Sequence, residues 1–134
     1  MVHEPYRILL LEPIQSVATD IISWLQERAQ IVHIRNPHEA MEKAALSHWD
    51  VVITDINAPD INDLDITAIV KRANPDTSLL IVTEHKKVDF IISAMQNHAD
   101  GLLFKPLEAK EFVNKVFKLA EDSREKRAKV VKLY

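Results

Sequence analysis

Residues 51–59 read VVITDINAP, a short apolar run that leads into an aspartate and a polar loop. The first three residues are β-branched and continuous, which is typical of a strand buried on both faces of a parallel sheet. Asp55 follows the run, where the strand is expected to end. In α/β proteins, ligands bind at the edge of the sheet where the carboxyl ends of the strands lie. This stretch therefore predicts a buried strand with an acid placed for function at its end.

Four more short apolar runs occur along the chain. They occupy residues 8–11, 31–34, 79–82 and 102–104. Between the runs lie segments whose apolar residues recur at helical spacing, each with one apolar stripe. These expected helices occupy residues 14–25, 37–47, 61–73, 88–95 and 112–120. This alternation predicts a doubly wound α/β fold, with a five-stranded parallel sheet and five helices on its two faces.

Two local signals mark helix boundaries. Asn36 is a favoured N-cap residue and Pro37 suits the first helical position, so a helix is expected to begin there. Another helix is expected to stop at Asn74, because Pro75 disfavours helical backbone in the residue before it.

The composition excludes several classes of protein. The chain has 134 residues, enough for one ordinary domain, and its 47% apolar and 28% charged residues are typical of a globular fold. It has no cysteine, which excludes disulfides, thiolate metal sites and cysteine nucleophiles. Gly101 is the only glycine, so the dinucleotide and P-loop motifs are absent. No apolar run approaches the length of a membrane span, and we expect a soluble, cytoplasmic protein that does not act at a membrane.

Polar residues follow four of the expected strands. They are Glu12, Asp55, Thr83 and Lys105. Taken singly, each has an ordinary structural explanation, such as a turn aspartate, a strand-end threonine or a solvated charge. Because parallel strands bring their carboxyl ends to one edge of the sheet, the four side chains are expected to meet there.

This ordered set resembles the receiver domain of two-component response regulators. Asn57 and Pro59 in the loop after Asp55, and the proline that follows Lys105, also match the family's pattern. The resemblance extends over residues 7–120. It implies the flavodoxin-like receiver fold with strand order 2-1-3-4-5, an order taken from the resemblance and not from the spacing.

The resemblance also implies a chemistry. Asp55 would accept a phosphoryl group from a sensor histidine kinase or a histidine phosphotransfer protein, so the chain would be a phosphoacceptor and not a turnover enzyme. Mg²⁺ would be held by Glu12, Asp55 and the backbone carbonyl of Asn57. Lys105 would pair with the phosphoryl oxygens. The Thr83 hydroxyl would bond another of these oxygens and report phosphorylation to the neighbouring loop.

The sequence departs from the family's pattern at several positions, of which four bear on function or on a helix end. Pro13 stands where a second acid is usual, so the resting site is expected to bind Mg²⁺ weakly and the phosphorylated site more tightly. Glu84 replaces a small residue and is interpreted as a solvated loop residue, with the missing carboxylate as the alternative. Leu102 replaces an aromatic residue, which removes the usual aromatic switch. His98 replaces a glycine and is interpreted as a strained helix terminus rather than a metal ligand.

Two other functions compete with a phosphorylatable receiver. Pro13 and Glu84 favour a degenerate receiver that acts as a phosphorylation-independent interaction module. A flavodoxin-like cofactor protein would suit the fold, but the phosphate loop rich in Ser, Thr and Gly is missing after the first strand. The retained Asp55, Thr83 and Lys105 favour the phosphorylatable receiver.

The two ends of the chain receive different assignments. Residues 1–120 are assigned to the receiver domain and residues 121–134 to a charged helical extension or linker. Between residues 124 and 132 lie five basic residues and one acid. They lack aromatic neighbours and any nucleic-acid motif, so nucleic-acid binding is not expected, and a solvated helix or a linker to an output domain is favoured. The fourth and fifth helices offer a face for a homodimer or for an output partner, and the sequence leaves the two open.

Overall fold

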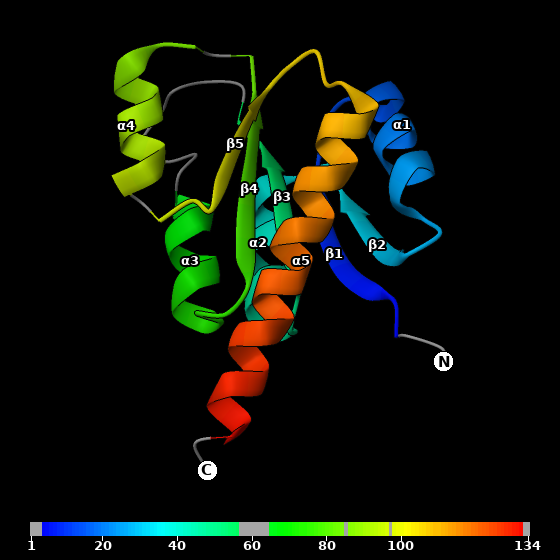
Figure 1. The fold of residues 1–134 in the computed structure, drawn as a ribbon. Helices are drawn as coiled ribbons and strands as arrows, with labels where there is room; N and C mark the ends of the chain where they lie inside the picture. Colours follow the sequence, from blue (N-terminus) through cyan, green and yellow to red (C-terminus); the bar gives the residue numbers. More distant parts are fainter. Residues whose placement is uncertain (1–3, 57–64, 85, 97, 133–134) are drawn as a thin grey trace.

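The computed structural model describes residues 4–56, 65–84, 86–96 and 98–132. Its strands form one parallel sheet in the order β2-β1-β3-β4-β5, which confirms the predicted fold class and strand order (Figure 1). The strands are β1 (Tyr6–Leu11), β2 (Ala29–Ile34), β3 (Val51–Asp55), β4 (Ser78–Thr83) and β5 (Gly101–Phe104). Each strand contains its predicted apolar run and is one or two residues longer.

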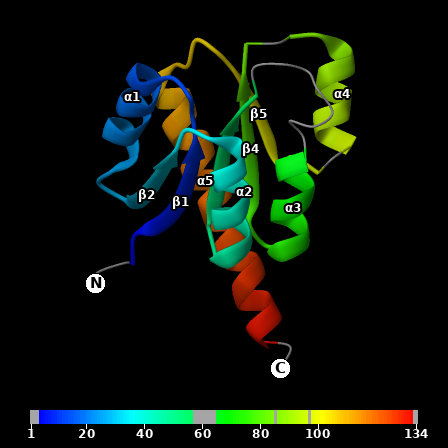
Figure 2. The same cartoon turned by 180° about the vertical axis from the view of Figure 1, so that it is seen from behind.

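Helices cover both faces of the sheet, as the alternation predicts (Figure 2). The described helices are α1 (Gln15–Leu25), α2 (Pro37–Leu46), α3 (Asp65–Ala73), α4 (Val88–Gln96) and α5 (Ala109–Lys132). α1 and α5 pack on one face, where Ile21 and Phe112 are among the core residues. α2, α3 and α4 contribute Ala44, Val70 and Ala94 to the core on the other face. The sheet is thus sandwiched between two separate hydrophobic cores.

Burial follows the position of each strand in the sheet. β3 and β4 are central and are buried along their whole lengths. In β1, Ile8 and Leu10 enter the core under α1 and α5, whereas Leu9 and Leu11 enter the opposite core. β2 is an edge strand, and its residues 31–33 are only half-buried. Continuous apolar runs are therefore needed in the inner strands, because both faces of the sheet are covered.

Two predicted features of the helix ends are confirmed. Asn36 Oδ1 accepts a hydrogen bond from the His38 N–H at 2.8 Å, and Pro37 occupies the first helical position. His98 has a φ of 69°, the left-handed backbone expected of a strained helix terminus. The part of the third helix that was predicted over residues 61–64 lies outside the described residues, and α3 is described from Asp65.

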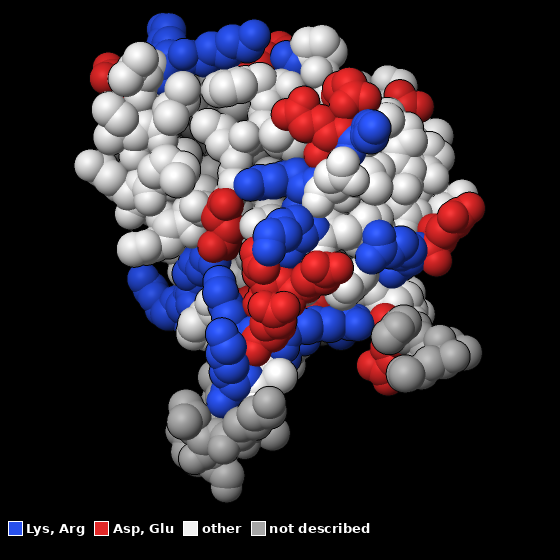
Figure 3. Space-filling view, in the orientation of Figure 1, with Lys and Arg blue, Asp and Glu red and all other residues white. Residues whose placement is uncertain are grey.

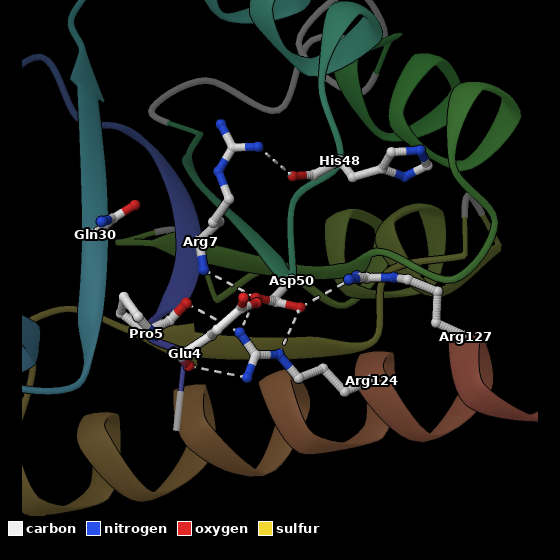
Figure 4. Close-up of a pocket in the computed structure, with 8 residues that line it drawn as sticks. All are labelled: Glu4, Pro5, Arg7, Gln30, His48, Asp50, Arg124 and Arg127. Atoms are coloured by element: carbon white, nitrogen blue, oxygen red, sulfur yellow. Dashed lines mark hydrogen bonds and ion pairs between the residues drawn. The ribbon is translucent and has the colours of Figure 1, made fainter. Parts of the chain in front are cut away.

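α5 continues past residue 120 without a break, and its charged end is not simply solvated. Arg124 Nη2 lies 3.3 Å from Asp50 Oδ2, and Arg127 Nη2 lies 3.1 Å from Asp50 Oδ1. The Asp50 side chain is only 2% exposed, and its Oδ2 also accepts the Arg7 N–H at 2.8 Å. Figure 4 shows both arginines reaching from α5 toward Asp50, next to the start of β3. The prediction of a solvated extension is therefore wrong for these two arginines, while the domain boundary at residue 120 stays a prediction.

α4 keeps an apolar stripe outside the core. Val88, Ile92 and Met95 are 67%, 49% and 54% exposed. Figure 3 shows mostly uncharged side chains over α4, whereas charged side chains crowd the surface of α5. The interface expected on the fourth and fifth helices stays a prediction.

Among the described helices, none has both the length and the apolar character that crossing a membrane requires.

Candidate functional site

The candidate site lies at the carboxyl edge of the sheet, at the top of Figure 1. Backbone hydrogen bonds continue the strand pairing to the residues that carry the site. The Glu12 N–H donates to the carbonyl of Ile34 at 3.1 Å, and the Lys105 N–H donates to the carbonyl of Thr83 at 2.8 Å. Asp55 is the last residue of β3 and pairs with Val82 of β4. The loops therefore leave the sheet from fixed positions, and their first side chains start close together.

Glu12, Asp55 and Lys105 meet in one buried cluster. Lys105 Nζ lies 2.8 Å from Glu12 Oε1 and 3.4 Å from Asp55 Oδ1. The side chains of Lys105, Glu12 and Asp55 are 7%, 1% and 1% exposed, respectively. The predicted convergence of these three residues is confirmed, whereas their chemical roles stay predictions.

Asp55 is held in an environment that disfavours its charge. Burial and, to a smaller extent, the nearby charge of Glu12 raise the pKa of Asp55 from 3.8 to about 6. The Lys105 ammonium opposes both effects. The Lys105 ammonium lies at ion-pair distance from Asp55, but the geometry of this contact is not that of a hydrogen bond. Neither Asp55 oxygen accepts a hydrogen bond from the described residues. The Asp55 carboxylate is thus buried and electron-rich, with oxygens available to bond an incoming group.

Glu12 uses both of its carboxylate oxygens. Oε1 faces Lys105, while Oε2 accepts a hydrogen bond from the Ile14 N–H at 3.2 Å. Ile14 is the N-cap residue of α1 and provides no side-chain cap of its own. Glu12 therefore joins the candidate site to the first turn of α1.

The Thr83 hydroxyl is directed toward the loop after β3. The residue is fully buried, and its Oγ1 donates a hydrogen bond to the Ile56 carbonyl at 2.6 Å. Ile56 is itself held by a hydrogen bond from its N–H to the Val82 carbonyl at 3.0 Å. The predicted role of Thr83 as a reporter of phosphorylation stays a prediction.

Other residues singled out from the sequence lie around the site or beyond the described chain. Glu84 is exposed, in agreement with its interpretation as a solvated loop residue. Together with Lys105 and residues of α1 such as Trp24, it lines a cavity of about 550 Å³. Asn57 and Pro59 lie outside the described residues. In the described part of the chain, no group of three or more His, Asp or Glu side chains is arranged to hold a metal ion.

Sequence reasoning missed two side chains that touch the loop between β1 and α1. His33 Nε2 lies 2.8 Å from the Glu12 carbonyl, and Arg35 donates from Nη2 to the Pro13 carbonyl at 3.1 Å. His33 lies in the edge strand β2 and is half-buried. Its alignment beside β1 follows from the parallel pairing of β1 with β2, which the apolar runs alone do not specify.

The sheet order and the buried cluster of two acids and a lysine at its carboxyl edge define an α/β domain of the receiver type. A comparison with protein families agrees with this class, since the description "Response regulator receiver domain" matches residues 8–117. The chain belongs to the receiver domain family of two-component response regulators. Receiver domains are phosphoacceptor modules and not turnover enzymes.

Curated relatives of the chain are regulatory proteins. It is 30% identical over 113 residues to the transcriptional regulatory protein LnrK of Bacillus subtilis, covering 82% of this chain and 51% of that protein. It is 31% identical over 71 residues to the regulatory protein LuxO of Vibrio cholerae, covering 53% of this chain and 16% of that protein. The matched segments are thus about half of one relative and a small part of the other.

Solved receiver structures share the fold. A CheY-like response regulator receiver domain protein from Methanospirillum hungatei superposes with a TM-score of 0.83 at 15% identity, covering 92% of this chain and 99% of that chain. The signal receiver domain of an HD domain-containing protein from Pseudomonas fluorescens gives a TM-score of 0.84 at 18% identity, covering 96% of each chain. At these identities the likeness concerns the fold alone.

Proposed function

We propose that this receiver domain accepts a phosphoryl group on Asp55 from a histidine-phosphorylated donor. One observation carries the proposal: the Asp55 carboxylate is buried, has no hydrogen-bond donor among the described residues, and lies 3.4 Å from the Lys105 ammonium. A carboxylate with only a structural role would destabilise the fold in this setting, because the oxygens of a buried acid normally accept hydrogen bonds. A carboxylate that is to act as a nucleophile needs a free oxygen.

The proposed transfer exchanges one bond to phosphorus for another. An Asp55 oxygen attacks the phosphorus of a phosphohistidine and forms a P–O bond as the P–N bond breaks. The imidazole nitrogen of the donor leaves with the electron pair of that bond. Lys105, already between Glu12 and Asp55, is placed to attract the phosphoryl oxygens.

The two described carboxylates, those of Glu12 and Asp55, favour a divalent cation. Two buried carboxylates face a single ammonium, which leaves the cluster one negative charge in excess. We propose that Glu12, Asp55 and the backbone carbonyl of Asn57 hold Mg²⁺, since Mg²⁺ prefers a few oxygen ligands together with phosphate and water. When bound, Mg²⁺ neutralises charge on the transferring phosphoryl group.

Binding of Mg²⁺ is expected to depend on the phosphoryl group. In the resting site Glu12 Oε2 is occupied by the Ile14 N–H and Lys105 already offsets one of the two acids. We expect Mg²⁺ to bind about tenfold more tightly when beryllofluoride, a mimic of the phosphoryl group, is present. Titration calorimetry with and without beryllofluoride measures this coupling. Asp55→Asn, which cannot hold the mimic, serves as the control, and equal affinities in the wild type would contradict the coupling.

The phosphoacceptor role is tested by intact mass. We expect the protein incubated with Mg²⁺ and acetyl phosphate to gain one phosphoryl group, because Asp55 is buried with a free oxygen beside Lys105. The adduct should be absent in Asp55→Asn and should be removed by hydroxylamine, which cleaves acyl phosphates. Asp20→Asn changes an exposed acid of α1 and serves as the matched control. Full modification of Asp55→Asn would place the acceptor elsewhere.

The competing proposal is a degenerate receiver that binds its partner without phosphorylation. Pro13 in place of an acid and the internal pairing of Glu12 with Lys105 favour this function. It predicts no adduct even with a cognate kinase. The two proposals therefore give opposite results in the same mass measurement.

Membership of the family implies a histidine kinase as the partner of the domain. We propose that a sensor kinase or a phosphotransfer protein delivers the phosphoryl group in the cytoplasm.

We also propose that Thr83 transmits the phosphorylation of Asp55 to the neighbouring loop, because its hydroxyl donates a hydrogen bond to the Ile56 carbonyl in the loop that follows Asp55. A phosphoryl oxygen that attracts this hydroxyl would release the Ile56 carbonyl and alter the loop.

A further inference from the structure

The loop between β1 and α1 is fixed by side chains from the neighbouring strand. His33 Nε2 lies 2.8 Å from the carbonyl oxygen of Glu12. Arg35 directs two donors at the carbonyl oxygen of Pro13, Nε at 3.3 Å and Nη2 at 3.1 Å. Because a carbonyl oxygen only accepts, the His33 ring must carry its proton on Nε2. The carbonyls of Glu12 and Pro13, which belong to the two peptide groups on either side of Pro13, are therefore both held by residues that come from β2 or follow it directly.

Pro13 makes these contacts important. A proline has no N–H, so the loop loses one of the backbone donors that would hold it in place. The next N–H, that of Ile14, donates to Glu12 Oε2 at 3.2 Å. The direction of the Glu12 carboxylate thus depends on where the backbone around Pro13 places the Ile14 amide. Glu12 is also the only acid of this loop, so no second carboxylate compensates if it is misplaced.

We infer that His33 and Arg35 are positioning residues for the Glu12 carboxylate, and we call this pair the β2 brace. Parallel pairing of β2 with β1 sets His33 opposite Leu10, beside the end of β1. From there the brace fixes the two peptide groups on either side of Pro13, which are Glu12–Pro13 and Pro13–Ile14. Glu12 Oε2 then meets the Ile14 amide, and Oε1 is left facing Lys105 at 2.8 Å. The part of this inference that concerns Mg²⁺ rests on the proposed function.

Paired variants distinguish the effect of losing the hydrogen-bond donor from the effect of changing the side chain. His33→Leu and Arg35→Met remove the donors, whereas His33→Gln and Arg35→Lys keep one donor each. The matched control is His38→Leu, because His38 is exposed in the first turn of α2. The thermal unfolding of each variant is measured first, so that only variants that fold are compared.

Two measurements report on the brace. The first is the affinity of Mg²⁺ for the beryllofluoride-bound protein, measured by titration calorimetry. We expect about a tenfold loss in His33→Leu and in Arg35→Met, since residues that orient a metal ligand typically contribute to this extent. The second is the NMR shift and hydrogen exchange of the Ile14 amide in metal-free protein. This amide should lose protection in the same two variants and keep it in His33→Gln and His38→Leu.

Two results would overturn the inference. One is an unchanged Ile14 amide and unchanged Mg²⁺ affinity in His33→Leu and Arg35→Met. The other is an equal loss in His33→Gln and His33→Leu, because the donor would then not be the cause. If the wild type binds no Mg²⁺ and forms no adduct, the proposed function fails by itself. The Ile14 amide of the metal-free protein then still decides whether the brace positions Glu12.

Discussion

Asp55→Asn should be more stable than the wild type at pH 8, by about 3 kcal/mol. At that pH the Asp55 carboxyl is ionised in the folded and in the unfolded chain. Only in the folded chain is the charge buried next to Glu12, and the pKa of Asp55 is accordingly raised from 3.8 to about 6. An asparagine removes the buried charge and leaves Lys105 paired with Glu12 at 2.8 Å. The stability of the fold is thus expected to be lowered by the residue that the proposed function needs.

The sign of the effect follows from the raised pKa. An acid whose folded pKa lies above its unfolded pKa destabilises the fold above about pH 6, and this loss disappears as the pH falls through 6 toward 4. The advantage of Asp55→Asn at pH 8 should therefore shrink to about a third at pH 4.5. Urea unfolding at both pH values measures it, with Asp20→Asn as an exposed-acid control. A variant that is less stable than the wild type at pH 8, or an advantage that does not shrink, would contradict this account of Asp55.

Asp50→Ala should destabilise the fold by about 3 kcal/mol. Asp50 is buried at the opposite edge of the sheet from Asp55, and it accepts hydrogen bonds from the Arg7 N–H and from the guanidinium groups of Arg124 and Arg127. An alanine leaves the Arg7 N–H without this acceptor and separates the two arginines from their shared acid. Because the arginines are about one-third exposed, water can solvate them, which keeps the loss at the lower end of the range for buried ion pairs.

A nearby acid provides the control for Asp50. Asp76 Oδ2 pairs with Arg127 Nε at 2.6 Å, but its side chain is 18% exposed. Asp76→Ala should lower the free energy of unfolding by less than about 1 kcal/mol, as for other accessible ion pairs. Chemical unfolding at pH 7 compares the two variants. Equal losses would mean that Asp50 is no more important to the attachment of α5 than the half-buried Asp76.

The fold could be predicted from the sequence because its signal is repeated along the chain. The apolar run of β4, residues 79–82, has both of its faces in a core, and it reads as a buried strand without any tertiary information. The helices show the stripe of residues that covers each core. Strand order did not follow from these patterns and came from the family resemblance, because an apolar run does not state which strand lies beside it.

The site could be predicted only in part. Glu12, Asp55 and Lys105 each follow a strand, and parallel strands bring such residues to one edge. The hydrogen bond from the Ile14 N–H to Glu12 and the contacts of the β2 brace depend on the direction of single side chains. The spacing of apolar residues in the sequence does not indicate these directions. Asp50 was missed for the same reason, because the partners Arg124 and Arg127 lie more than seventy residues away in the sequence. From the sequence alone, Arg124 and Arg127 appear as part of a run of solvated charges, whereas in the fold both pair with the buried Asp50.

The most direct test of the central claim is to locate the phosphoryl group in the chain. The protein is incubated with Mg²⁺ and acetyl phosphate and is then reduced with borohydride, which converts an aspartyl phosphate to homoserine. Peptide mass spectrometry identifies the position of the homoserine. We predict homoserine at position 55, and none when Asp55→Asn is treated in the same way. Homoserine at another aspartate, or none in the wild type after treatment with a cognate kinase, would contradict the phosphoacceptor role of Asp55.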